Sequence, residues 1–401
     1  MPRRQPSMDP ATLALAAIVW HGSTEIAAGR AERGPWQQNE SRYDYVDDPA
    51  VALDERGGVA FAWVDQGKKD VYFGRQGEAV NVSRSPDTFS WLPRLALAGD
   101  KVFVLWQEII FSGGSHGGDM LFARSEDGGK SFSAPLNLSS SRAGDGKGRI
   151  DPQLWHNGSF DLVVDSDAVY AAWTEYEGRL WLRRSRDGGR TFSRAVKLDE
   201  AKPARAPSLA VQGNSVYLAW TVGDERSADV RVARSDDGGG TFGKAAIVHR
   251  SKPYSDSPSI ALDERGVLHL VYAEGRQIVY ARSHDRGSSF ERPRAVSPER
   301  AGFPALGLDG AGNLYVLWER FAEHPHLPRG LALAVSRDGG RTFEAGEVPG
   351  SAGAGWNGSS QGLLMRKLAV GKQGALAIVN SSLKPNDASR VWLTRGQLNP
   401  G

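Results

Sequence analysis

An eight-residue motif, Ser-x-Asp-x-Gly-x-x-Phe, occurs five times in this sequence, and no other feature restricts the fold as much. The copies begin at Ser125, Ser185, Ser235, Ser283 and Ser336. They follow one another at intervals of roughly 50 residues, and a period of that length is typical of a repeat architecture. One copy would mean little, but five copies at a regular spacing predict a structural unit repeated along most of the chain.

A second repeat lies upstream of each motif and alternates as a half-buried β-strand does. Val216-Tyr-Leu-Ala-Trp220 is typical, an apolar segment that ends in an aromatic residue. Seven such segments occur, and in the last, Leu376-Ala-Ile-Val-Asn380, asparagine takes the aromatic position. A third apolar repeat, as in Pro207-Ser-Leu-Ala-Val, precedes the second. Each module therefore holds strands a and b, then strand c, the motif as a turn, and strand d, which together make one β-propeller blade.

We predict an all-β protein, a single β-propeller domain over residues 1–401 with seven four-stranded blades, six blades being the alternative. The seventh module has almost no chain left for strand d after Arg395, so residues 12–21 are expected to supply that strand and close the ring, which hides the sheet edges. Cleavage of a signal peptide would remove this strand, so we do not expect one, and the compartment stays open. The expected blades span approximately residues 46–84, 90–139, 151–199, 204–250, 256–297, 302–348 and 362–396.

The composition excludes several classes of function. The net charge is +2 and the charged residues are interspersed, so nucleic acid is not an expected partner. The chain has no Cys, which rules out disulfides and thiolate metal sites. No apolar run reaches the about 18 residues of a membrane-spanning helix. His324 and His326 form the only close His pair, without a metalloprotease pattern, so we expect no metal ion and no cofactor.

The repeated motif itself is interpreted as a structural turn between strands c and d. A short carboxylate such as Asp187 can accept hydrogen bonds from its own turn, and the following glycines allow the positive φ that the turn needs. Function is then expected on the opposite face, where the longer loops surround the central pocket. Several carboxylates, arginines and a tryptophan there suit an anionic sugar or another polar ligand, although such mouths are also polar simply because water covers them. The candidate ligand-binding residues of this kind are Arg94, Arg149, Glu108, Glu274, Glu319, Asp48, Trp91, His156 and Asn157.

The motif resembles the Asp box of the BNR-repeat, sialidase-like propellers, and the resemblance covers nearly the whole chain. Arg205-Ala-Pro-Ser-Leu209 is similar to the Arg-Ile-Pro segment of that family. The resemblance implies that Arg205 is the first of three arginines that clamp a substrate carboxylate, since the planar guanidinium fits a carboxylate bidentately. It also implies that Arg226 is a second member of the clamp and that Asp229 is the catalytic acid/base.

The chain departs from the family in three respects. The Arg205 segment lies in the fourth module rather than the first, and seven modules are present where the family typically has six blades. The family's nucleophile is a Tyr activated by a Glu, but the similar segment here, Asn380-Ser-Ser-Leu383, begins with Asn. Tyr176 with Glu175 is the substitute pair that we consider.

Two functions remain open from the sequence. In the first, the propeller recognises a glycan or another polar ligand in its central pocket and could be an exo-glycosidase of the sialidase-like type. In the second, it is a non-catalytic scaffold that binds a protein partner. The fold cannot choose between them, because propellers host many functions.

Overall fold

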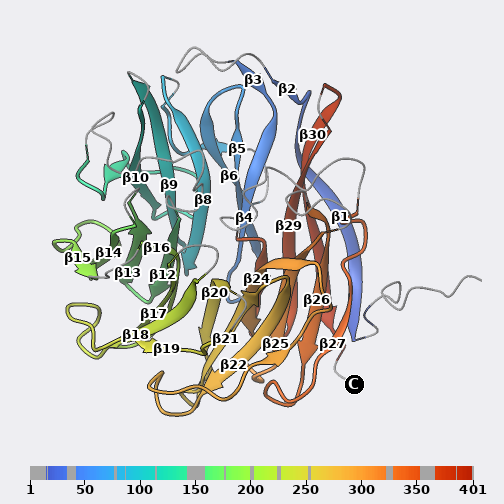
Figure 1. Ribbon diagram of the computed structural model, residues 1–401. Coiled ribbons are helices and arrows are strands. Elements are labelled where there is room, and N and C mark those ends of the chain that lie inside the picture. The colour runs from blue at the N-terminus through green and yellow to red at the C-terminus, as the bar shows by residue number, and fades with distance from the viewer. Residues whose placement is uncertain are drawn as a thin grey trace, which may run out of the picture.

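The computed structural model describes residues 15, 17–33, 42–75, 79–85, 87–112, 115–141, 159–175, 178–198, 203–223, 227–251, 254–321, 328–352, 366–384 and 386–399. Within these ranges every regular element is a β-strand, and no helix long and apolar enough to cross a membrane is present. Seven four-stranded antiparallel sheets surround a central axis, as Figure 1 shows. The predicted seven-bladed propeller is confirmed.

Six of the blades follow one another along the chain, each with its four strands in sequence order. Blade 1 consists of β4 (Val46–Leu53), β5 (Val59–Asp65), β6 (Asp70–Gly74) and β7 (Val80–Asn81). Blade 2 consists of β8 (Phe89–Ala98), β9 (Lys101–Ser112), β10 (Ser115–Ser125) and β11 (Leu136–Asn137). Blade 3 consists of β12 (Phe160–Asp165), β13 (Ala168–Thr174), β14 (Leu180–Ser185) and β15 (Val196–Leu198).

The second half of the ring repeats this order. Blade 4 consists of β16 (Ala204–Gln212), β17 (Ser215–Val222), β18 (Asp229–Ser235) and β19 (Ala246–Ile247). Blade 5 consists of β20 (Ser255–Leu262), β21 (Leu268–Glu274), β22 (Gln277–Ser283) and β23 (Arg294–Ala295). Blade 6 consists of β24 (Ala301–Leu308), β25 (Leu314–Phe321), β26 (Pro328–Ser336) and β27 (Glu344–Glu347). The first strands of neighbouring blades contact one another all the way round, so they form the inner wall of the ring.

Blade 7 joins the two ends of the chain. Its strands are β28 (Leu368–Val370), β29 (Ala375–Lys384), β30 (Ala388–Leu398) and, as the outer strand, β1 (Ile18–Gly29). The predicted closure by an N-terminal strand is confirmed, but β1 runs to Gly29, well past residue 21 where we expected the strand to end. It is longer because the hairpin β29–β30 extends to Lys384 and gives β1 a partner as far as Ser389. A short two-stranded sheet, β2 (Glu32–Arg33) and β3 (Tyr43–Asp44), follows β1.

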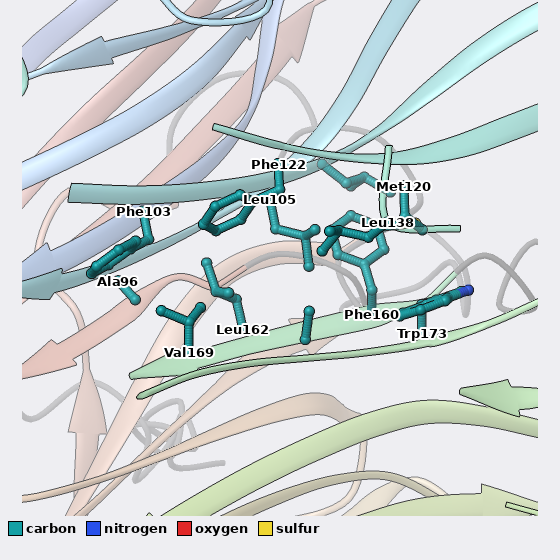
Figure 2. Close-up of a cluster of buried hydrophobic side chains, with 12 residues drawn as sticks. Ala96, Phe103, Leu105, Met120, Phe122, Leu138, Phe160, Leu162, Val169 and Trp173 are labelled. Carbon is teal, nitrogen blue, oxygen red and sulfur yellow. The ribbon is translucent and has the colours of Figure 1, made fainter. Parts of the chain in front are cut away.

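The hydrophobic core lies between the blades rather than at the axis. Figure 2 shows the cluster between blades 2 and 3, where Phe103 and Phe122 face Leu162 and Val169. Successive side chains of a strand point to opposite faces of its sheet, and the middle strands, such as β17, are buried along nearly their whole length. The inner part of each blade is therefore buried on both faces. Full burial of one such side chain contributes about 1.5–3 kcal/mol. The blades therefore stabilise one another, and no blade has a complete core of its own.

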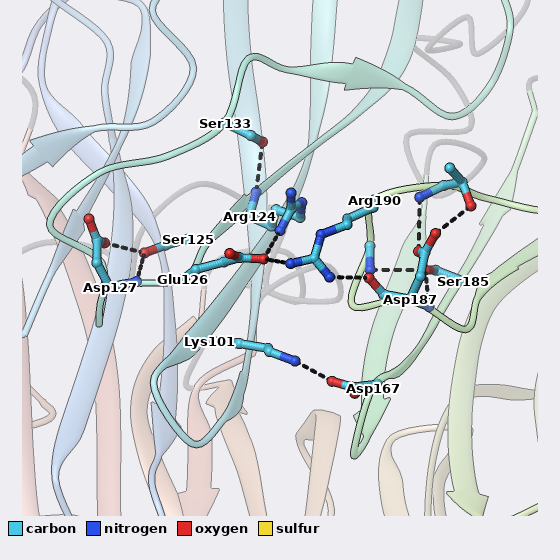
Figure 3. Close-up of polar contacts among 12 residues, drawn as sticks. Lys101, Arg124, Ser125, Glu126, Asp127, Ser133, Asp167, Ser185, Asp187 and Arg190 are labelled. Carbon is cyan, nitrogen blue, oxygen red and sulfur yellow. Dashed lines mark hydrogen bonds and ion pairs between the residues drawn. The ribbon is translucent and has the colours of Figure 1, made fainter.

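The Asp-box turns have the structural role that we inferred from their composition. In blade 3, Ser185 Oγ donates a hydrogen bond to Asp187 Oδ1 at 2.6 Å and Thr191 N donates to the same oxygen at 2.9 Å (Figure 3). Gly189 N donates to Ser185 Oγ at 2.9 Å, which closes the turn. These hydrogen bonds to the ionised form hold the pKa of the Asp187 carboxyl well below its usual range.

Each box also contacts the blade before it. Phe343 packs edge-on against Tyr280 of blade 5, with 5.3 Å between ring centroids, and Phe192 meets Phe122 of blade 2 in the same way at 5.0 Å. Arg282 of blade 5 donates to the Gly339 carbonyl at 2.8 Å. The motif is thus both a turn and an inter-blade contact, which explains why serine, aspartate, glycine and phenylalanine recur together.

Replacing Gly340 tests this contact. Its φ is 83° and a Cβ there would lie 2.3 Å from the Tyr280 ring, whereas Gly266 has a φ of 79° and nothing within 4 Å of a Cβ. We expect Gly266→Ala to lower the free energy of unfolding by about 1 kcal/mol through backbone strain alone. Gly340→Ala should lower it by about a further 1–3 kcal/mol through the clash. Urea unfolding of both variants measures the difference, and equal losses would contradict the inter-blade contact.

Candidate functional site

The inner strands share a backbone irregularity near the central channel. Five residues that precede proline have a left-handed conformation with φ between 51° and 56°: Asp48, Leu92, Ala206, Ser257 and Phe303. Each coincides with a shift in strand register. Such conformations cost about 1–3 kcal/mol each and persist only where the surroundings hold them. The same strained backbone conformation thus recurs at one position of the inner strand in five blades, and it is a regular feature of the inner wall of the ring.

Polar side chains hold these bulges. Ala206 N donates to Ser159 Oγ of the preceding blade at 2.6 Å, and Leu92 N donates to Asp48 Oδ2 at 3.4 Å. The hydroxyls of Ser208 and Ser259 accept hydrogen bonds from the inner strands of the following blades, at 3.2 and 3.0 Å. Asp48, a predicted ligand-binding residue, is 3% exposed and belongs to this set. Many polar groups at the axis therefore serve the ring itself.

A small cavity lies where the inner strands of blades 2 to 6 converge with Arg366, which precedes β28. Its volume is about 50 Å³, and its polar wall includes Arg94, Ser159, Ser208, Ser257, Ser259 and Arg366. One water needs about 10–15 Å³, whereas a pocket that encloses a whole small molecule measures about 300–1,000 Å³. Between the described residues the cavity therefore has room for a few waters or one small anionic group, and not for a sugar ring.

Arg94 lines this wall with a buried donor that has no hydrogen-bond partner among the described residues. It is 5% exposed, its Nε donates to the Phe160 carbonyl at 3.2 Å, and its guanidinium stacks 5.1 Å from the Phe160 ring. Its Nη1 is buried and has no hydrogen-bond partner among the described residues. Burial, and next the nearby charge of Arg366, lower the pKa of Arg94 to about 9. Arg94 therefore stays cationic at neutral pH while carrying an unsatisfied buried donor, which native proteins rarely tolerate.

Arg366 and Asp161 complete the charge balance. Arg366 forms an ion pair with Asp161, which is fully buried, while the Arg366 side chain itself is 31% exposed. Asp161 also accepts a hydrogen bond from Leu209 N at 2.8 Å. Arg94 and Arg366 therefore both line the cavity, while the buried carboxylates of Asp161 and Asp48 lie close enough to Arg94 to offset part of this positive charge. Such a site favours an anionic group that can bond to both guanidinium groups.

The structure places Arg205 in a different environment from the one expected for a substrate clamp. Its Nε lies 3.2 Å from both carboxylate oxygens of Asp256 and its Nη2 lies 3.0 Å from Oδ2, while Nη1 donates to the Gly223 carbonyl. Arg205 is 5% exposed. An internal carboxylate thus occupies the position that a substrate carboxylate would take. The pair joins blade 4 to blade 5.

Arg205 and Asp229 are not brought together. Arg205 lies opposite Thr221, and Asp229 lies opposite Val222, the next residue of the same strand. Successive side chains of a strand point to opposite faces of the sheet, so Arg205 faces blade 5 while Asp229 faces blade 3. The half-buried Asp229 therefore stays a predicted acid/base without Arg205 beside it. Arg226, the other residue of the implied constellation, lies outside the described residues.

Glu108 belongs to a buried hydrogen-bond network. It accepts hydrogen bonds from Ser90 Oγ and Trp106 Nε1, both at 2.8 Å, and from Thr88 Oγ1. Burial raises the pKa of Glu108 to about 7, and the charge of Asp70 adds to the increase while the hydrogen bonds oppose it. The carboxyl thus titrates near neutral pH, but its oxygens are already engaged by the protein.

The remaining predicted site residues are dispersed. Glu319 is buried in an ion pair with Lys367, and Glu175 is buried at the turn after β13. Glu274 ends β21 with a buried Oε1 that has no hydrogen-bond partner among the described residues, and Trp91 packs beside the core between blades 2 and 3. The other four predicted site residues also lie outside the described ranges: Tyr176, Arg149, His156 and Asn157.

Sequence reasoning missed Arg366 and Asp161, although a signal for them was present. When the inner strands are aligned on their apolar repeat, Arg94, Asp161 and Lys367 share one position, and Arg366 stands where five other inner strands have the bulge proline. Charged side chains are rarely buried, so a charged residue at a buried position of a repeat indicates a role beyond packing. Elsewhere in the described part of the chain, no three His, Asp or Glu side chains gather as a metal ion would need.

The fold defines this protein as a seven-bladed β-propeller with a small polar cavity among its inner strands, lined by Arg94 and Arg366. No sequence family and no curated protein matches the chain. Among solved structures it is similar to a protein of unknown function from Dyadobacter fermentans, with a TM-score of 0.54 and 12% identity over 96% of this chain and 100% of that chain.

Two enzymes share the fold at a similar level. An ulvan lyase of a new polysaccharide lyase family, bound to a GlcA–Rha3S saccharide, has a TM-score of 0.52 and 13% identity over 86% of this chain and 93% of that chain. A mutant Trypanosoma rangeli sialidase with trans-sialidase activity has a TM-score of 0.51 and 12% identity over 96% of this chain and 59% of that chain. At these identities the likeness shows the fold alone, so the resemblance to sialidases holds for the architecture.

A double-mutant comparison tests the structural role of the Arg205–Asp256 pair. Arg205→Met leaves the largely buried Asp256 carboxylate without its cation, and we expect the free energy of unfolding to fall by about 2–4 kcal/mol, near the lower end for a buried pair. Adding Asp256→Asn removes the stranded charge and should restore at least half of that loss. Urea unfolding measures both variants. A single variant within about 0.5 kcal/mol of wild type would instead show that Arg205 is dispensable to the ring.

The pKa of Glu108 predicts a pH-dependent stability. The folded pKa of about 7 exceeds the unfolded value, so the folded state keeps a proton that the unfolded state has lost. The contribution of Glu108 is therefore greatest below about pH 4 and declines as the pH rises to about 7. Glu108→Gln removes this decline, so the variant should gain about 1–3 kcal/mol relative to wild type between about pH 5 and pH 8. The exposed Glu264→Gln is the control, and a matching profile for both variants would contradict the prediction.

Proposed function

We propose that this propeller recognises an acidic glycan or another polar ligand by its anionic group, which enters the central cavity between Arg94 and Arg366. The buried, unpartnered Nη1 of Arg94 carries the proposal. Desolvating a donor without a partner costs about 1–3 kcal/mol, and more for a charged group, so a bound anion would recover free energy that the empty cavity loses. The remainder of the ligand would lie above the cavity, on the face opposite the Asp boxes.

Recognition without hydrolysis fits the geometry better than exo-glycosidase activity. Arg205 is engaged by Asp256, and Asp229 points to the other face of its sheet. The buried Glu108 accepts three hydrogen bonds and lacks a described catalytic partner. These observations support a binding site built on Arg94 and Arg366. The alternative is that the propeller is a scaffold that binds a protein partner.

Binding measurements with matched sugars test the proposal. By calorimetry, wild type should bind glucuronate or N-acetylneuraminate and not glucose, and binding should weaken with salt, because the contact is between charges. Arg94→Gln keeps much of the side chain's length but removes its charge, and it should weaken binding at least about tenfold, as expected for loss of one hydrogen bond to a charged group.

Arg390→Gln is the matched control, because Arg390 is exposed on the outer hairpin of blade 7 and should leave binding unchanged. Equal affinity for glucose and glucuronate, or no effect of Arg94→Gln in a folded protein, would contradict the proposal. Turnover of an aryl sialoside that Asp229→Asn abolishes would instead establish the exo-glycosidase.

A further inference from the structure

Asn380 breaks the pattern of the strand-b repeat. The same position holds Trp63, Trp106, Trp173, Trp220, Tyr272 and Trp318 in the other six blades. Asn380 is fully buried, its Oδ1 accepts a hydrogen bond from Lys367 Nζ at 2.9 Å, and its Nδ2 has no hydrogen-bond partner among the described residues. A buried amide with an unsatisfied nitrogen is costly, and such a group in a native structure calls for an explanation.

Lys367 and Glu319 complete a buried triad with Asn380. Lys367 is 4% exposed and Glu319 is 1% exposed. Lys367 Nζ forms an ion pair with the Glu319 carboxylate, which β25 of blade 6 supplies. Lys367 directly precedes β28, and its carbonyl accepts a hydrogen bond from Val379 N at 2.9 Å, so the strand that carries Asn380 is fixed beside it. An amine, an amide carbonyl and a carboxylate are thus held together away from water.

We propose that Lys367 and Asn380 condense to form an intramolecular isopeptide bond, with Glu319 as the proton carrier. The Lys367 ammonium gives a proton to Glu319, and the neutral Nζ attacks Cγ of Asn380. The Nζ–Cγ bond forms, the Cγ–Nδ2 bond breaks, and Nδ2 leaves as ammonia with the proton that Nζ releases. No oxidant or further reactant is needed, because one amide replaces another.

The surroundings favour each step. Lys367 Nζ and the Glu319 carboxylate are buried and in direct contact, so the proton has only a short distance to move between them. A carboxylate within hydrogen-bond reach of the amine is correctly placed for general base and then general acid catalysis. Packing holds the two reacting groups in contact, which replaces the entropy cost of a bimolecular encounter. Nδ2 has no hydrogen-bond partner among the described residues, so no such bond must break when the Cγ–Nδ2 bond breaks and ammonia leaves.

The cross-link would act in blade 7, the blade that closes the ring. β28 has three residues and is the shortest inner strand of the seven blades, and blade 7 is the blade that joins the two chain ends. The chain has no Cys, so a disulfide cannot secure this point. A bond between Lys367 and Asn380 would tie β28 to β29 covalently. It would also anchor Arg366, the neighbour of Lys367, in the wall of the central cavity.

Mass spectrometry of the full-length denatured protein tests the bond directly. We expect wild type to be lighter than its sequence by one ammonia, about 17 Da. Trypsin should then release residues 367–372 joined to residues 373–390 as a branched peptide, because Lys367 carries the link to Asn380. A wild-type mass equal to the sequence, with the two peptides separate, would overturn the proposal, and that result leaves ligand binding at Arg94 untouched.

Variants assign the roles within the triad. Glu319→Gln keeps the shape but removes the proton carrier, and Lys367→Arg keeps the charge but removes the amine, so both should show the full sequence mass. Lys384→Arg, an exposed change in the same strand as Asn380, should keep the ammonia loss. Because the bond forms only in the folded blade, urea unfolding must first show that each variant folds cooperatively before its mass is interpreted. A complete ammonia loss in Glu319→Gln would refute the role of Glu319.

Discussion

The pairing of β1 with β30 is the constraint on which the rest of the molecule depends. Each blade buries its two faces only against its neighbours, so a ring with one open joint would expose two sheet faces and a pair of strand edges at once. β1 pairs with β30 from Ile18 to Gly29, whereas the outer strands of the other blades have between two and four residues. The pairing of β1 with β30 is therefore much longer than the pairing of the outer strand in any other blade. This length compensates for the position of β1, which no short loop connects to β30.

The fold could be predicted because its determinants are local and repeated. The Ser, Asp and Gly of each box satisfy a turn that is complete within eight residues, and the aromatic residue of strand b fills the space between blades. Each local motif is a weak signal by itself, but its repetition predicts the blades strongly. The repeat also showed that the seventh blade lacks a fourth strand, which the N-terminal segment had to supply. The end of that strand was misplaced because it follows the length of the hairpin β29–β30, which no motif of β1 encodes.

The candidate site was less predictable because arginine has two uses near the axis: it joins neighbouring blades, and it lines the cavity. Arg205 sits in a segment that resembles a substrate clamp, yet Asp256 of the next blade neutralises it, and that partner is 51 residues away along the chain. Arg94 has no such motif, yet its buried Nη1 has no partner among the described residues, and Arg366 of blade 7 lines the same cavity. Whether an arginine is available to a ligand depends on contacts between blades, and sequence spacing within one blade does not reveal them.

Departures from the repeat carry the information that the repeat itself lacks. A position that holds tryptophan or tyrosine in six blades is under one packing requirement, and asparagine cannot meet it, since a buried amide needs hydrogen-bond partners rather than apolar neighbours. The structure shows that Asn380 meets Lys367, at a position where four other inner strands have serine or alanine, and that Glu319 balances the lysine. Three polar residues from three separate repeat positions thus meet in one place. In a repeat protein, unusual residues that meet in one place are better explained by a shared chemical role than by independent random substitutions.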